Sequence, residues 1–255
     1  MTDVFDLTGR RALVTGGCRG IGAAIATAFA ERGAEVLVHG RGDKRSRAFA
    51  AEHGFSFLHA DFNQLDDVNA LADDLISAGR PLDILVNNAG METNATVENL
   101  DPEALGRQLR INLEAPILLT HRLIPLLKRS SHASIINVTS IHASVPAYAN
   151  SVYCAAKAGI ELFTQTLAME LGPARVRVNS IAPGAIATDM NRELLDQIGR
   201  GLFASWVPLG RLGEVADIAG PAVFLASDAS SYITAATIVV DGAYSRNVVR
   251  YRSAE

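Results

Sequence analysis

Tyr153 and Lys157 lie four residues apart in a segment with a strongly helical pattern, SVYCAAKAGIELFTQTLAMEL (151–171). On a helix, this spacing places both side chains on one face, one turn apart. A free tyrosine has a pKa of about 10, and a neighbouring ammonium group favours its phenolate form. The pair has the composition of a general acid/base, although an amphipathic helix with a surface lysine has the same spacing.

Ser140 joins this pair if the segment before it is a strand. The run SIINVTS (134–140) is rich in β-branched residues, and Ser140 is its last residue. Open α/β sheets bind their ligands outside the carboxyl ends of their strands. The sequence therefore predicts that the Ser140 hydroxyl holds a substrate oxygen beside Tyr153.

A glycine-rich turn near the N-terminus is a candidate phosphate-binding loop. The run RALVT (11–15) is followed by Gly16, Gly20 and Gly22 and then by an alanine-rich helical pattern. Glycines allow a sharp turn and bring backbone N–H groups close to a pyrophosphate, and the helix N-terminus adds a positive partial charge. The spacing G-x3-G-x-G differs from G-x-G-x-x-G, and no Lys-Ser/Thr pair follows as in a P-loop. A plain tight turn is the alternative.

The residues after the second predicted strand bear on the choice of cofactor. An acid at that position accepts hydrogen bonds from the adenosine ribose, but here Gly40 and Arg41 stand there. A guanidinium group binds a 2′-phosphate, which a carboxylate repels. Arg19, inside the glycine loop, is placed to reach the same phosphate. The pattern favours NADP(H) over NAD(H), with a solvated basic helix start as the alternative.

Strand and helix patterns alternate along the chain. Short apolar runs typical of strands occur at 11–15, 35–39, 55–60, 83–88, 134–140, 175–183 and 237–242. Helical patterns separate them, at 20–32, from about 44, at 65–78, from about 102 to 128, at 151–171 and at about 214–226. Such alternation predicts a parallel sheet of about seven strands with helices on both faces. We expect one α/β domain over residues 1–255, with a short C-terminal extension after about residue 243.

Length and composition exclude several classes of protein. The chain has 255 residues, 49% of them hydrophobic, and 23 Lys and Arg against 27 Asp and Glu. That balance gives no bulk attraction to nucleic acid or to an anionic membrane. No apolar run approaches the roughly 20 residues of a transmembrane helix, and the first residues carry acids where a secretory signal has an apolar core. The cysteines and histidines lack zinc-ligand spacing, so we expect no metal and a cytoplasmic location.

Further motifs, taken together, resemble the classical branch of the short-chain dehydrogenase/reductase family. In the family's order and spacing they are Thr15-Gly16 through Gly22, Asp61, Asn87-Asn88-Ala89-Gly90, Asn112, Ser140, Tyr153 to Lys157, Asn179, Pro183-Gly184, PLGRLGEVADIA (208–219) and IVVDG (238–242). The resemblance covers the chain from about Thr8 to Gly242. It implies a doubly wound, Rossmann-type fold and an NAD(P)-dependent oxidoreductase that interconverts a secondary alcohol and a carbonyl. Ala235 and Ala243 stand where the family usually has glycine.

The resemblance implies four catalytic residues. Tyr153 passes a proton to or from the substrate oxygen while a hydride moves to or from the nicotinamide C4, and Ser140 orients that oxygen. Lys157 lowers the pKa of Tyr153 and holds the nicotinamide ribose. Asn112 seats a water that links Lys157 to solvent. Pro116 has no N–H to donate to the Asn112 carbonyl, which leaves that carbonyl free to accept a hydrogen bond from the water. A simple kink at Pro116 is the alternative.

The resemblance also implies a cofactor site along the carboxyl ends of the strands. Its residues are Gly16, Arg19, Gly20, Ile21, Gly22, Arg41, Asp61, Phe62, Asn87, Gly90, Tyr153, Lys157, Pro183, Gly184, Ile186 and Thr188. Among these, Asp61 meets the adenine, and the turn from Pro183 to Thr188 fixes the carboxamide.

The residues that the resemblance places near the nicotinamide indicate the substrate. With Ser140, the polar residues Glu92, His142 and Asn150 suit a sugar, a sugar acid or a polyol, with solvent-facing rim positions as the alternative. The region expected to form a lid carries apolar residues that suit an acyl chain or a sugar ring. They are Met190, Phe203 and Trp206.

Two other functions stay open at this point. The same core supports reduction of 3-oxoacyl thioesters on acyl carrier protein, for which basic residues of the helix at 102–128 offer a docking surface. A nucleotide-sensing protein without turnover is a candidate from a different class. Such a protein does not need Asn112, Ser140, Tyr153 and Lys157, so the presence of all four disfavours it. The resemblance further implies a homotetramer, assembled through the helices at 102–128 and 151–171.

Overall fold

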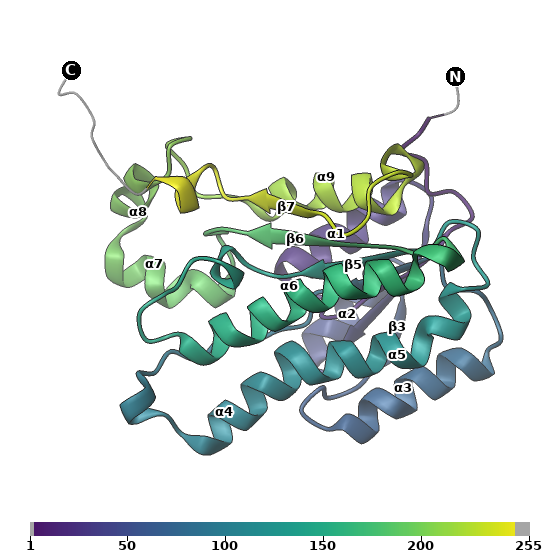
Figure 1. Ribbon diagram of the computed structural model, residues 1–255, viewed down its shortest axis with the longest axis horizontal. Coiled ribbons are helices and arrows are strands. Elements are labelled where there is room, and N and C mark those ends of the chain that lie inside the picture. The colour runs from purple at the N-terminus through teal and green to yellow at the C-terminus, as the bar shows by residue number, and fades with distance from the viewer. Residues whose placement is uncertain (1–2, 248–255) are drawn as a thin grey trace.

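The computed structural model, which describes residues 3–247, is built on a seven-stranded parallel sheet (Figure 1). Its strands are β1 (Arg11–Val14), β2 (Glu35–Gly40), β3 (Ser56–His59), β4 (Ile84–Asn87), β5 (Ser134–Val138), β6 (Arg177–Pro183) and β7 (Thr237–Val240). The order in the sheet is β3-β2-β1-β4-β5-β6-β7, and each neighbouring pair is parallel. The doubly wound α/β fold is thus confirmed. The strand order reverses at β1 and β4, where such sheets bind their ligands.

Helices cover both faces of the sheet. Helices α3 (Leu65–Ser77), α5 (Ala115–Leu127) and α6 (Ser151–Leu171) pack on one face, where Figure 1 shows α3 beside α5. The opposite face carries α1 (Gly20–Glu31), α2 (Lys44–Glu52) and α9 (Val215–Ala226). The remaining helices, α4 (Pro102–Leu109), α7 (Arg192–Ile198) and α8 (Arg200–Trp206), lie at the edge of these layers. Within residues 3–247, no helix combines the length and apolarity needed to cross a bilayer.

Burial on both faces explains the continuous apolar runs of the central strands. In β1, Ala12 and Val14 pack with α1 and α9, whereas Leu13 between them packs with α3 and α5. The same alternation holds for β4, in which Ile84 and Val86 belong to one core and Leu85 to the other. Successive side chains of a strand point to opposite faces, so a strand that is covered twice needs an apolar residue at every position.

The helical stretch predicted from about 102 to 128 is interrupted. After α4, residues Arg110–Glu114 form a single π-helical turn, and α5 then begins at Ala115. Pro116 follows this turn, and its missing N–H removes one α-helical bond in agreement with the break. Wide turns of this kind occur at functional sites in helices. Here the turn carries Asn112.

A segment between β6 and α9 forms a separate small cap, the lid. It contains the short 3-10 turn Asp189–Asn191 and helices α7 and α8. Its own apolar cluster joins Leu195, Phe203 and Val207. The Tyr244 ring lies 5.4 Å from that of Phe203, so the start of the C-terminal extension packs on the lid. Residues 248–255 of that extension lie outside the described part of the chain.

The two departures from the family pattern fall at unusual backbone positions. Ala235 and Ala243 have φ values of +60° and +68°, in the left-handed region that favours glycine. They flank β7, whose first residue, Thr237, donates a hydrogen bond to Glu161 of α6, two turns of helix beyond Tyr153. Their effect is therefore on the conformation of this edge strand.

Candidate active site

The catalytic helix α6 brings Tyr153 and Lys157 together in a buried place. The Lys157 Nζ lies 5.6 Å from the centroid of the Tyr153 ring and donates a hydrogen bond of 2.9 Å to the Val138 carbonyl at the end of β5. Tyr153 and Lys157 are only 7% and 5% exposed. The spacing of four residues therefore has the predicted effect, and the lysine is additionally fixed to the neighbouring strand.

The expected effect of Lys157 on the pKa of Tyr153 is wrong in this structure. Burial raises the pKa of the Tyr153 phenol, the Glu92 carboxylate raises it further, and a hydrogen bond with Ser140 acts in the opposite direction. Burial also lowers the pKa of Lys157 to about 8, against the opposing effect of Glu92. Desolvation dominates because both side chains are withdrawn from water, and the Lys157 ammonium group is not among the groups that shift the pKa of Tyr153. Tyr153 thus keeps its proton at neutral pH, as a general acid requires.

Asn112 connects the π-helical turn to the loop after β4. Its side-chain oxygen accepts a hydrogen bond of 2.9 Å from the Met91 N–H, and its side-chain nitrogen donates one of 2.7 Å to the Met91 carbonyl. A side chain at Gly90 would meet the Asn112 oxygen at 3.1 Å and the Lys157 Nζ at 3.7 Å. Asn112, Gly90 and Lys157 therefore lie close together, as expected.

Ser140 lies directly after β5 and begins the 3-10 turn Ile141–Ala143. Its hydroxyl oxygen accepts a hydrogen bond of 3.1 Å from the His142 N–H. The His142 ring lies with Nδ1 at 2.9 Å from the Val145 carbonyl. Because a carbonyl only accepts, Nδ1 carries a proton in this contact.

Two of the predicted substrate residues contact each other. The side-chain nitrogen of Asn150, the residue before α6, donates a hydrogen bond to the Glu92 carboxylate. Asn150 is 4% exposed, and its side-chain oxygen is buried without a hydrogen-bond partner among residues 3–247. Glu92 also acts electrostatically on both Tyr153 and Lys157. A carboxylate and a buried acceptor therefore accompany the catalytic pair.

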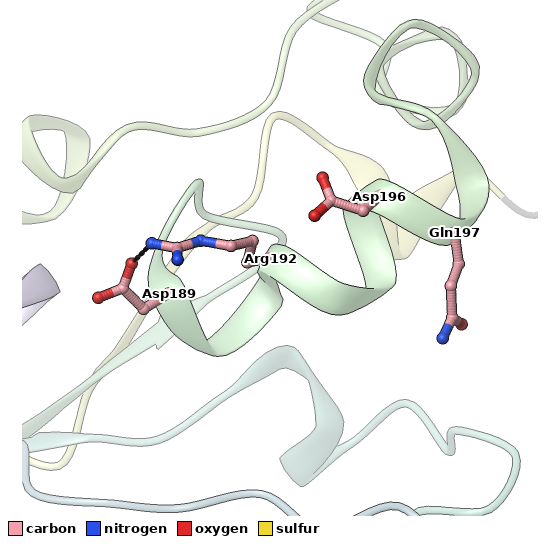
Figure 2. Close-up of a pocket in the computed structure, with 4 residues that line it drawn as sticks. All are labelled: Asp189, Arg192, Asp196 and Gln197. Carbon is pink, nitrogen blue, oxygen red and sulfur yellow. Dashed lines mark hydrogen bonds and ion pairs between the residues drawn. The ribbon is translucent and has the colours of Figure 1, made fainter.

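The predicted lid residues differ in their surroundings. Met190 is 51% exposed, whereas the Trp206 ring packs 5.4 Å from the Phe203 ring inside the lid. The lid also has a hollow of about 500 Å³ (Figure 2). Arg192 and Asp189 form an ion pair there, and Asp196 and Gln197 point away in different directions. This hollow contains none of the predicted catalytic residues.

The glycine loop makes the sharp turn that the sequence predicts. Gly16 and Gly20 have φ values of +60° and +53°, and a side chain at Gly22 would overlap the Gly16 carbonyl oxygen. A side chain at Gly20 would meet Thr188 of the lid segment at 3.7 Å. The loop and the turn after β6 thus face each other across the switch point. Ile21 follows in the first turn of α1.

The turn after β6 is held by close packing. Gly184 donates a backbone hydrogen bond of 2.9 Å to Val240, and a side chain at Gly184 would meet the Asp241 Cβ at 2.5 Å. Ile186 is buried and pairs with Gly213 in an isolated bridge. The predicted carboxamide-binding turn, which begins at Pro183, is consequently fixed to the end of β7.

The adenosine end of the predicted site lies along β2 and β3. Asp61 accepts a hydrogen bond of 3.0 Å from the Asn63 N–H, and the buried Phe62 ring stacks on the imidazole of His39 at 4.0 Å. Arg19 and Arg41 are exposed, and neither forms an ion pair with another described residue. Two unpaired guanidinium groups thus stand where the sequence predicts a 2′-phosphate.

Asn87, at the end of β4, takes part in a network of buried polar side chains, while its side-chain oxygen has no hydrogen-bond partner among the described residues. Its side-chain nitrogen donates hydrogen bonds to Thr120 at 3.0 Å and to Asn137 at 2.8 Å. The Asn137 side-chain nitrogen in turn donates a hydrogen bond of 2.8 Å to the hydroxyl of Thr164 on α6. The Asn87 side chain therefore belongs to a buried polar chain under the catalytic helix.

Sequence reasoning missed residues that hold the cofactor loop in place. His39 accepts a hydrogen bond of 3.2 Å from the Gly16 N–H at Nδ1, and Nε2 lies 3.0 Å from the Ala60 carbonyl. The Thr15 hydroxyl accepts from the N–H groups of Asn88 and Ala89 at 2.9 and 3.0 Å. These contacts join segments far apart in the chain. A histidine inside an apolar strand was the available signal for the first of them.

Fold and site together define a dinucleotide-dependent oxidoreductase scaffold. The family model described as enoyl-(acyl carrier protein) reductase matches residues 16–245. The 3-oxoacyl-(acyl-carrier-protein) reductase FabG of Chlamydia pneumoniae is 37% identical over 246 residues, 93% of this chain and 98% of that protein. This chain belongs to the short-chain dehydrogenase/reductase family.

Solved structures of similar proteins support the same conclusion. A putative gluconate dehydrogenase from Agrobacterium tumefaciens superposes with a TM-score of 0.90 at 30% identity, covering 95% of this chain and 98% of that one. A gluconate 5-dehydrogenase from Burkholderia cenocepacia, in complex with NADP and tartrate, has a TM-score of 0.88 at 31% identity, with coverage of 96% and 98%. Within the described residues, no group of His, Cys, Asp and Glu side chains has the arrangement of a metal site.

Proposed function

We propose that this chain is an NADP(H)-preferring dehydrogenase/reductase that interconverts a secondary alcohol and a carbonyl in a sugar, a sugar acid or a polyol. The observation that carries the substrate class is the Glu92–Asn150 contact at the start of the catalytic helix. With His142, which lies two residues after Ser140, this contact supports a site whose side chains hydrogen-bond hydroxyls. An acyl chain offers nothing to such groups, and burying them against it carries a desolvation cost.

The residues of the chain orient the substrate and move its proton. In the reductive direction, Ser140 and Tyr153 donate hydrogen bonds to the substrate carbonyl, and the buried Tyr153 phenol transfers its proton to that oxygen. Lys157, held by Val138, supports the nicotinamide ribose. When bound, the nicotinamide cofactor supplies or removes the hydride.

The preference for NADP(H) rests on the charges at the end of β2 and in the glycine loop. Arg41 and Arg19 are exposed and without ion-pair partners among the described residues, so a 2′-phosphate gains contacts without breaking existing ones. The similar gluconate 5-dehydrogenase was solved with NADP, which agrees with this proposal. NAD(H) is the second candidate cofactor.

Reduction of 3-oxoacyl thioesters is the alternative function. It is favoured by the identity of 37% to a reductase of this kind. A nucleotide-sensing protein without turnover is the alternative from another class. It is disfavoured because Asn112, Ser140, Tyr153 and Lys157 converge as described above.

A substrate panel tests the proposed function. The enzyme is mixed with NADPH or NADP⁺ and with sugars, sugar acids, polyols and acetoacetyl thioesters, and the absorbance of the reduced cofactor is followed. We expect the hydroxylated compounds to react with the higher kcat/KM. High turnover of the thioesters without turnover of the hydroxylated compounds overturns the substrate class. Absence of turnover with every carbonyl and alcohol supports the sensing protein.

The assembly and the location are further parts of this proposal. We expect a homotetramer in the cytoplasm. The large apolar side chains of Leu162 and Met169 on α6 are 64% and 72% exposed, which suits burial against another copy. Light scattering that gives a monomer mass near 27.0 kDa contradicts the tetramer.

A further inference from the structure

We infer that Glu92 makes this enzyme select uncharged or cationic hydroxylated substrates and reject carboxylates. The inference rests on the proposed function, because it concerns the substrate that lies beside Tyr153. The inference narrows the proposed substrate class to sugars, polyols and their amino derivatives. Sugar acids fall outside it because they carry a carboxylate. Glu92 is thus a specificity-determining residue rather than a catalytic one.

The first step is the placement of a negative charge next to the reacting groups. Asn150 holds the Glu92 carboxylate by a hydrogen bond, and Asn150 lies three residues before Tyr153. Glu92 acts electrostatically on the buried Tyr153 and Lys157. Charges interact more strongly in such a place than in water because the effective dielectric constant is lower. A substrate carboxylate that reaches this place is repelled.

The second step is the kind of hydrogen-bonding group that the site presents. The side-chain oxygen of Asn150 is an acceptor that is buried without a partner among residues 3–247. That oxygen is enclosed by protein, so the acceptor that the site presents to a substrate is the half-buried Glu92 carboxylate. Hydroxyl and ammonium groups donate to it. A carboxylate group at the same carbon has no proton to donate, so it cannot replace them.

The third step concerns positive charge that could compensate. Lys157 is bonded to the Val138 carbonyl and is the lysine assigned to the nicotinamide ribose. Within residues 3–247, no other lysine or arginine forms a hydrogen bond or ion pair with Glu92, Asn150 or Tyr153. A substrate carboxylate beside Tyr153 therefore meets the charge of Glu92 without a compensating cation.

The test uses substrates that differ in charge on one carbon skeleton. The kcat/KM values of gluconate, glucitol and 1-amino-1-deoxyglucitol are measured with NADP⁺ for the wild type, for Glu92→Gln and for Glu98→Gln. Glutamine keeps an oxygen that accepts from Asn150, so the first variant removes charge with little change in shape. Glu98 is an exposed carboxylate of the same loop and serves as the matched control. An unchanged circular dichroism spectrum and thermal unfolding midpoint show that each variant is folded.

We expect the wild type to use glucitol and the amino compound at least tenfold better than gluconate. Glu92→Gln should reduce this ratio about tenfold, the effect of one charge at roughly 10 Å and an effective dielectric constant of about 20. Glu98→Gln should leave it unchanged. A wild type that prefers gluconate, or an unchanged ratio in Glu92→Gln, overturns the inference while leaving the oxidoreductase intact. If no polyol reacts, the proposed substrate class fails. Selection against negative charge is then tested with methyl acetoacetate and acetoacetate, by the ratio of the kcat/KM of the uncharged ester to that of the carboxylate.

Discussion

The imidazole of His39 accepts a hydrogen bond of 3.2 Å from the backbone N–H of Gly16, the first glycine of the cofactor loop. Its other nitrogen donates to the Ala60 carbonyl at 3.0 Å, directly before Asp61. One buried side chain thus links the glycine loop after β1 to the chain that follows β3. The Phe62 ring, stacked on the imidazole, completes this connection.

Replacing His39 should weaken cofactor binding more than it affects the chemistry. His39→Leu leaves the Gly16 N–H without its acceptor, and a buried unsatisfied donor costs about 1–3 kcal/mol. We expect the Kd for NADPH, measured by fluorescence titration, to rise about tenfold at a nearly unchanged kcat. The control is His121→Leu, because His121 is exposed on α5. Equal Kd values for both variants contradict the positioning role.

The stability of the fold should depend on pH through the same histidine. Burial lowers the pKa of His39 to about 4, whereas an unfolded histidine titrates near its ordinary value of 6.5. Between these values the unfolded chain binds more protons than the folded one, so the free energy of unfolding falls as pH falls from 6.5 to 4. This contribution amounts to about 3 kcal/mol at most. Urea unfolding at several pH values should show the slope in the wild type and a reduced slope in His39→Gln.

Removal of the phenol tests the assigned general acid. Tyr153→Phe keeps the ring but has no proton to transfer, so kcat should fall about 10²- to 10⁴-fold. The Kd for NADPH should change little. Tyr148→Phe is the matched control, because Tyr148 is 93% exposed and near in sequence. Reduction of carbonyls by Tyr153→Phe at the rate of the parent would falsify the mechanism.

Arg41 should determine much of the cofactor preference. Arg41→Ala removes one charge-assisted contact to the 2′-phosphate, worth about 1.5–3 kcal/mol. The ratio of kcat/KM for NADPH over NADH should fall ten- to a hundredfold, mainly through a higher KM for NADPH. Arg107→Ala, an exposed arginine on α4, should leave the ratio unchanged. A wild-type ratio below one contradicts the assignment of NADP(H).

The activity should follow the titration of Lys157. The kcat/KM for the cofactor reports the groups of the free enzyme, and the pKa of Lys157 is lowered to about 8. We expect a fall in kcat/KM as pH rises through about 8, because the ammonium group then loses its charge. The Glu92 carboxylate raises this pKa, so Glu92→Gln should move the fall to lower pH. If the fall in kcat/KM moves to higher pH in Glu92→Gln, the electrostatic effect of Glu92 on Lys157 is contradicted.

The fold and the catalytic helix were predictable because each depends on local pattern. Continuous apolar runs such as β1 and β4 mark strands buried on both faces, and the spacing of Tyr153 and Lys157 fixes their common side. The π-helical turn at Asn112 was not predictable, since five residues of wider turn barely alter the apolar periodicity.

Properties that depend on distant contacts also escaped the sequence. The direction of the Tyr153 pKa shift follows from how deeply the ring is buried, which its spacing from Lys157 does not reveal. The partners of His39 are residues 16 and 60, which only the assembled sheet brings together. The hydrogen bonds of the Asn87 side-chain nitrogen to Thr120 and Asn137 likewise join residues that are distant in the sequence.

The double hydrogen bond between the Asn112 side chain and Met91 limits how this protein can vary. It anchors the start of the loop after β4 to a helical frame, so an insertion at 90–92 would displace both the anchor and Glu92. The stretch from Thr93 to Leu100 has no such double anchor among the described contacts, and Val97 and Glu98 in it are exposed. Changes in loop length are therefore tolerated only downstream of the anchor, where new recognition elements can be grafted without disturbing the reacting groups.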